Sequence, residues 1–106
     1  MSEVVEYPVV VTARHMELTE AIREYAAKKA GGLQFGYPRI VEVKVILDQS
    51  SHGHLAEMVV IAADNVVLEA ETETADLYEA IDATVQKIAR QMRKQKTRML
   101  KSHGHG

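Results

Sequence analysis

Seven lysine and arginine side chains lie in the last 20 residues of the chain, and no acid lies among them. They are Lys87, Arg90, Arg93, Lys94, Lys96, Arg98 and Lys101. Ammonium and guanidinium groups bind phosphates through charge and hydrogen bonds, so these seven residues are suited to binding a polyanion. Residues 1–86 hold all 15 acids and only six bases, so the net charge of −2 conceals a dipolar molecule.

The histidines form no motif for metal binding, and the chain carries no motif for catalysis. His52 and His54, and likewise His103 and His105, supply two ligands per pair, whereas a structural zinc site takes four. The chain lacks cysteine, a glycine-rich phosphate loop, a G-x-S-x-G elbow and an H-E-x-x-H helix. We therefore expect a protein that is not an enzyme and that holds no metal or cofactor.

A long amphipathic helix must carry the basic run. Asp76, followed three residues later by Glu79, predicts a capping box at its start, and the helical pattern continues to about Leu100. One face is apolar and contains Leu77, Ile81, Thr84, Val85, Ile88, Met92 and Met99. Lys87, Arg90, Lys94, Arg98 and Lys101 fall on a separate arc, which we expect nearly opposite the apolar one, with Arg93 between the two.

Two interpretations of this basic arc compete. A solvated helix end is one, because lysines near a helix C-terminus are favoured by the helix dipole. However, like charges four residues apart destabilise a helix by about 0.2–0.5 kcal/mol per pair, and no interleaved acid relieves them here. Such uncompensated repulsion favours a polyanionic partner.

The rest of the chain predicts an α+β domain of order β-α-β-β-β-α, in which a four-stranded sheet carries two helices packed on one face, as in double-stranded-RNA-binding domains. Thr19 predicts the start of the first helix and Gly31-Gly32 its end. The polar stretch 48–54 is expected to be a loop between two strands. Asp64-Asn65 predicts a hairpin turn between the next two strands. We expect one domain at 1–101 and a disordered His/Gly tail at 102–106. The strands are expected at 7–13, 40–47, 55–63 and 66–73, and the first helix at 20–30.

Nucleic acid is the favoured polyanion. No apolar run approaches the ~20 residues of a membrane span, the basic helix lacks the Trp or Phe of a membrane-lying helix, and the acidic N-terminus lacks a secretory signal. A cytoplasmic location without membrane contact is therefore expected. Contacts between the basic arc and phosphates cannot distinguish one base sequence from another. The spacings typical of zinc fingers and helix-turn-helix motifs are absent from the sequence. We therefore expect structured RNA rather than DNA as the partner.

Two segments carry a family resemblance, which extends from about Val9 to Lys101. TARHMELTEAIREYAAKKAGGL (Thr12–Leu33) and ADLYEAIDATVQKIARQMRKQKTRM (Ala75–Met99) resemble the ribosome hibernation promoting factors, whose relatives include ribosome-associated inhibitor A. The resemblance implies the same β-α-β-β-β-α fold. It also implies translation inhibition by binding 16S rRNA of the small (30S) subunit and the 70S ribosome, where the family occludes the mRNA and tRNA (A/P) sites in stationary phase or stress.

The resemblance implies RNA contacts at ten positions. These are Lys87, Arg90, Arg93, Lys94, Arg98 and Lys101, with Arg14, Arg23, Lys28 and Lys29 as additions for which an ordinary surface charge is the alternative. The chain lacks the extra C-terminal domain of the long branch, so it resembles the short form. Pairing of ribosomes would then need another protein, such as ribosome modulation factor. A second hypothesis is a protein-binding regulator, similar to a sigma-factor modulator, that uses the exposed sheet face.

Overall fold

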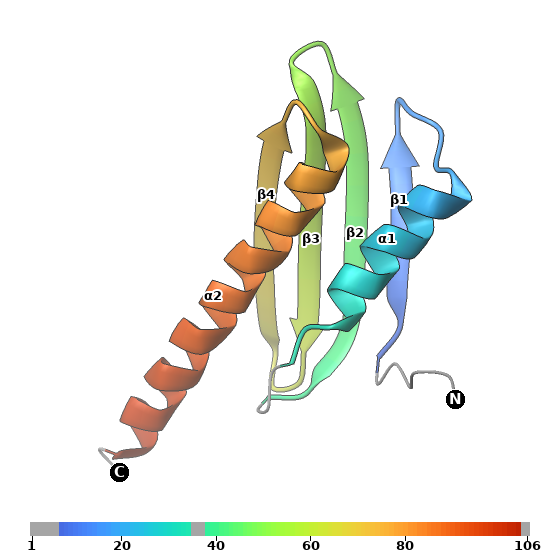
Figure 1. Ribbon diagram of the computed structural model, residues 1–106. Helices are drawn as coiled ribbons and strands as arrows, with labels where there is room; N and C mark the ends of the chain where they lie inside the picture. Colours follow the sequence, from blue (N-terminus) through green and yellow to red (C-terminus); the bar gives the residue numbers. More distant parts are fainter. Residues whose placement is uncertain (1–6, 35–37, 105–106) are drawn as a thin grey trace.

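A four-stranded sheet with both helices on one face forms the body of the molecule (Figure 1). The computed structural model describes residues 7–34 and 38–104, and describes side chains as far as residue 95. The order β-α-β-β-β-α and the predicted fold class are confirmed. The elements are β1 (Val9–Arg14), α1 (Glu20–Gly31), β2 (Ile40–Ser50), β3 (Gly53–Ala62), β4 (Val66–Thr74) and α2 (Leu77–Gly104).

The strands follow one another across the sheet in the order β1-β2-β3-β4. β1 runs parallel to β2, and a parallel pair needs a crossover connection, which α1 supplies. β2, β3 and β4 form an antiparallel meander. Thr19 caps α1 as predicted, because its Oγ1 accepts a hydrogen bond from the Ile22 amide at 3.2 Å.

The core lies between the sheet and the helices. Alternate residues of the central strands β2 and β3 point toward the helices, as the period of two predicts. On the helices, side chains that are three, four or seven residues apart pack against these strand residues. Fully buried side chains include Val43, Val45, Leu47, Met58, Val60, Ala26, Ala30, Ala80, Ile81 and Ile88.

The β2–β3 connection is tighter than predicted. The polar stretch 48–54 was expected to be a loop, but β2 continues to Ser50 and β3 begins at Gly53, with Ser50 paired to Gly53. Gly53 has φ +144°, and a Cβ there would lie 2.5 Å from the Thr74 carbonyl oxygen. Glycine thus permits the close approach of β4, and pairing in the sheet overrides the polar composition. The hairpin at Asp64-Asn65 is confirmed, because both residues have φ 63°.

The cap at the start of α2 differs in one detail from the predicted capping box. Asp76 Oδ1 accepts a hydrogen bond from the Tyr78 amide at 3.0 Å, as an N-cap should. The Asp76 amide donates to Thr74 Oγ1 at 3.2 Å, a role that a capping box gives to Glu79. Thr74 lies two residues before Asp76 and within reach of its amide.

The helix α2 is longer than predicted and continues to Gly104 rather than ending near Leu100. Its 28 residues span about 42 Å at 1.5 Å per residue, and its C-terminal end extends past the sheet (Figure 1). Residues 102–104, which were predicted to belong to the disordered tail, are therefore helical, and only 105–106 of that tail lie outside the described residues. In the described ranges, no helix is long and apolar enough to cross a membrane.

Candidate nucleic-acid interface

The predicted packed face of α2 holds the helix on β3 and β4. Leu77, Ile81, Thr84, Ile88 and Met92 are buried there, and the Thr84 hydroxyl lies 3.0 Å from the Ala56 carbonyl oxygen of β3. This packing turns the basic residues outward. Those whose side chains are described are all exposed, and we call them the α2 bases: Lys87, Arg90, Arg93 and Lys94. The side chains of Arg98 and Lys101 lie outside the described part.

One of the α2 bases also joins the helix to the sheet edge. Lys87 Nζ donates a hydrogen bond to the Glu71 carbonyl oxygen of β4 at 2.7 Å, and Gln91 Nε2 donates to the Glu69 carbonyl oxygen at 2.8 Å. Four helix residues rise about 6.0 Å and two strand residues about 6.6 Å, so the spacings match. Lys87 therefore flanks the packed face instead of lying nearly opposite it, because the helix runs along the edge strand. These contacts cover backbone groups that an edge strand would otherwise expose.

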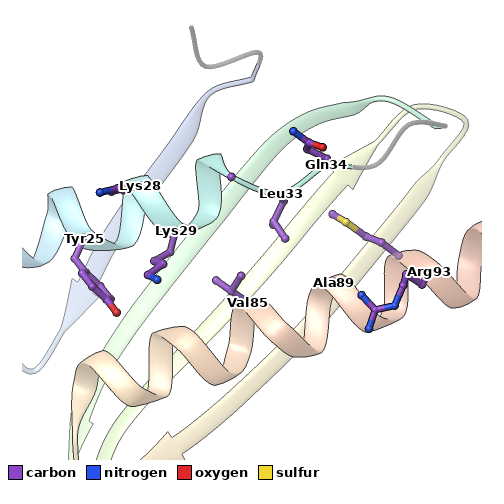
Figure 2. A pocket seen from close by; sticks show the side chains of 10 residues that line it. Tyr25, Lys28, Lys29, Leu33, Gln34, Val85, Ala89 and Arg93 are labelled. Atoms are coloured by element: carbon purple, nitrogen blue, oxygen red, sulfur yellow. The ribbon is translucent and has the colours of Figure 1, made fainter. Parts of the chain in front are cut away.

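A groove between α1 and α2 brings together bases from the two halves of the chain (Figure 2). Lys28 and Lys29 line it from the last turn of α1, and Arg93 lines it from α2. The groove has a volume of about 640 Å³. We call it the interhelical groove, and its other lining residues are Tyr25, Gly32, Leu33, Gln34, Val85, Ala89 and Met92. Three of the ten predicted contacts therefore line one groove, which the sequence did not indicate.

A polar link at one end of the interhelical groove joins the two helices. The Tyr25 hydroxyl donates to Asp82 Oδ1 at 2.7 Å, and this hydrogen bond raises the pKa of Tyr25. Lys29 Nζ lies 3.8 Å from the same oxygen and 5.5 Å from the centre of the Tyr25 ring. Tyr78 packs edge-to-face on Tyr25 with ring centres 4.8 Å apart. The link sets the spacing of the groove walls.

Arg14 and Arg23, the other two bases predicted in the first half of the chain, do not line the interhelical groove. Arg14 lies at the end of β1 with its guanidinium nitrogens 4.0 Å from Asp48 and 3.9 Å from Glu57. His15 Nδ1 lies 2.8 Å from Asp48 Oδ1, and this hydrogen bond lowers the pKa of Asp48. Arg23 is exposed on α1 but does not line the interhelical groove. Arg14 is therefore committed to carboxylates, and Arg23 is separate from the groove.

The sheet face opposite the helices, which we call the open face, is acidic. Glu69, Glu71 and Glu73 alternate along β4 and are exposed. Cross-strand pairing adds Glu57 next to Glu71. Phosphates are repelled by this face, so a polyanion is favoured only on the helix side. The open face also exposes apolar side chains, Val10 and Val67 among them.

The family model described as "Sigma 54 modulation protein / S30EA ribosomal protein" matches residues 9–100. The ribosome hibernation promoting factor of Escherichia coli K12 is 33% identical over 93 residues, which cover 88% of this chain and 96% of the relative. The ribosome hibernation promotion factor of Lactococcus lactis is 36% identical over 91 residues, or 84% of this chain and 49% of the relative.

Solved structures show the same fold. A ribosomal subunit interface protein from Coxiella burnetii superposes with a TM-score of 0.78 at 21% identity, covering 85% of this chain and 98% of that one. The N-terminal domain of Thermus thermophilus Protein Y superposes with a TM-score of 0.71 at 30% identity, covering 85% and 96%. The match of the family model over most of the chain is decisive: this protein belongs to the Sigma 54 modulation protein / S30EA ribosomal protein family.

Proposed function

We propose that this protein is a ribosome hibernation factor that binds 16S rRNA of the small subunit, in 30S particles and 70S ribosomes, and occludes the mRNA and tRNA (A/P) sites. The name of the Escherichia coli relative supports ribosome hibernation as the process. The observation that carries the proposal is the separation of charge: exposed α2 bases lie on the helix side, whereas exposed glutamates line the open face. A phosphate-rich surface therefore has one favoured orientation.

Inhibition by occlusion needs no catalysis. Proteins of this family are not enzymes, in agreement with the expectation from the sequence. A rigid domain bound to rRNA phosphates occupies volume that mRNA and tRNA require, so the two bound states exclude each other. Because each neutralised phosphate releases counterions, the affinity should fall steeply as salt rises.

The proposed interface centres on α2 and the interhelical groove. Arg98 and Lys101 extend the α2 bases toward the end of the helix, and Arg23 is an outlying contact. Arg14 is the weakest member of the predicted set, since Asp48 and Glu57 already neutralise it. The proposal further includes a cytoplasmic location, action in stationary phase or stress, and ribosome modulation factor as the partner for ribosome dimers.

Charge reversal on α2 tests the proposal. The double variant Arg90→Glu/Lys94→Glu should lose association with 30S and 70S particles in co-sedimentation, and should no longer inhibit cell-free translation. The matched control is Arg39→Glu/Lys44→Glu, because it changes two exposed bases at the start of β2 and on the open face by the same charge. If both variants lose association equally, net charge alone governs binding and the proposed interface is wrong.

The open face supports a second candidate function, a protein-binding regulator. On β4, the exposed Val67 lies on the same face as Glu69 and Glu71, and this mixture of apolar and acidic side chains is consistent with a protein partner. In that case Val67→Ser/Glu71→Lys should abolish the regulatory effect, while the reversals on α2 should leave it unchanged.

A further inference from the structure

We infer that the interhelical groove holds one unpaired nucleotide of the bound RNA, with its base against the apolar lining and its phosphate between the basic side chains of the two walls. The inference deepens the proposed function, since it depends on RNA lying against the helix side. It goes beyond phosphate binding, because it assigns a place to a single base.

The lining of the groove favours such an occupant. Leu33 and Val85 extend into the space between the helices from opposite sides (Figure 2), and Ala89 and Met92 continue the apolar surface along α2. The volume of about 640 Å³ is within the ~300–1,000 Å³ typical of small-ligand sites. Bases in an A-form duplex are paired and stacked, so only an unpaired base can enter a groove of this kind.

The basic residues at the rim offer positive charge to the phosphate of such a nucleotide. Within the described part of the chain, Lys28 and Arg93 have no carboxylate at ion-pair distance, whereas Lys29 is shared with Asp82. Lys28 and Lys29 come from the α1 wall and Arg93 from the α2 wall, so both helices supply bases to the rim. The Lys28 side chain is directed away from α2 (Figure 2), and it would reach a phosphate in the groove by a change of rotamer. The flat guanidinium of Arg93 can also stack on a base, whereas the Tyr25 ring already contacts Tyr78 and Lys29.

The walls of the groove are held in place before any ligand arrives. At one end, Tyr25 is hydrogen-bonded to Asp82 across the two helices. Where α1 ends, the buried Tyr7 hydroxyl lies 2.7 Å from the Ala30 carbonyl oxygen and 2.8 Å from that of Leu33. A preformed groove loses little conformational entropy on binding, which favours a specific pocket over a surface that closes around its ligand.

Three fluorescein-labelled RNAs test the inference with the full chain. They are a 16-base-pair duplex, the same duplex with one unpaired adenosine, and that bulged duplex with an abasic site in place of the adenosine. Stacking of one base against protein side chains predicts binding of the bulged RNA at least about fivefold tighter than binding of the other two.

A single substitution should remove this preference. Ala89→Leu fills the groove without changing charge, so the bulged RNA should bind no more tightly than the plain duplex, whose affinity should stay unchanged. Ala83→Leu is the matched control, because it makes the same change on α2 at a residue that does not line the groove. Should Ala89→Leu fail to fold, Lys28→Gln/Arg93→Gln changes only exposed side chains and should weaken the bulged RNA more than the duplex.

The outcomes separate the inference from the proposed function. Equal affinity of the unmodified protein for all three RNAs, with ribosome association intact, would overturn the inference and leave the proposed function standing. Loss of the preference in Ala83→Leu as well would also overturn it. If free AMP displaces the bulged RNA at a similar concentration, the groove is a site for a free nucleotide and the assignment to RNA is wrong. Failure of the chain to associate with ribosomes would refute the proposed function itself.

Discussion

Replacing Lys87 by methionine should destabilise the fold, although the residue is exposed and belongs to the α2 bases. Its Nζ donates to the Glu71 carbonyl oxygen at 2.7 Å. Such a hydrogen bond contributes roughly 0.5–1.5 kcal/mol net, with the charged donor strengthening it and water competition weakening it. We therefore expect a loss of about 1 kcal/mol in the free energy of unfolding. For a domain of this size, that loss lowers Tm by about 4–8 °C.

The comparison with Lys94→Met isolates this hydrogen bond. Lys94 lies two turns further along α2 and is exposed, and no hydrogen bond joins it to the described residues. Both substitutions remove one charge, and lysine and methionine have similar helix propensities. Lys94→Met should therefore stay within ~0.5 kcal/mol of the unmodified protein.

Urea unfolding followed by circular dichroism measures both changes under the same conditions. The difference in unfolding free energy between the two variants reports the contact of Lys87 with β4. Equal stabilities would show that Lys87 is a solvated base and that α2 does not protect the sheet edge. Both variants should lower the salt dependence of ribosome binding by a similar amount, because each loses one phosphate contact.

Three further predictions concern the stability of variants with a single substitution. Thr84→Val should lower the unfolding free energy by about 1–3 kcal/mol in urea titrations, because it removes a buried hydroxyl donor that lies 2.7 Å from the Ala80 carbonyl oxygen and 3.0 Å from the Ala56 carbonyl oxygen. Gly53→Ala should destabilise by more than ~1 kcal/mol and lower Tm, since its Cβ would lie 2.5 Å from the Thr74 carbonyl oxygen at a φ of +144°. Asp48 has a folded pKa lowered by His15, so its contribution is present above its unfolded pKa of ~3.9 and is lost as pH falls through the folded value. Acid unfolding curves of Asp48→Asn should therefore be shallower below about pH 4.

The sequence by itself determined the order of the elements and the identity of the packed faces. The apolar period of α2 predicted its buried residues Ile81 and Ile88. Caps and turns at Thr19 and Asp64-Asn65 were also predictable, because their hydrogen bonds and dihedral angles are local. Such features depend on residues only a few positions apart.

Only the tertiary structure decided which bases are neighbours and which are already paired. Lys28 and Arg93 line the same interhelical groove, Lys87 bonds to the β4 backbone, and Arg14 is paired with Asp48. Each of these contacts joins segments distant in the chain, and depends on how α1 and α2 lie on the sheet. Residue type and local spacing predict which side chains are charged and exposed. The packing of distant elements determines what those charges contact.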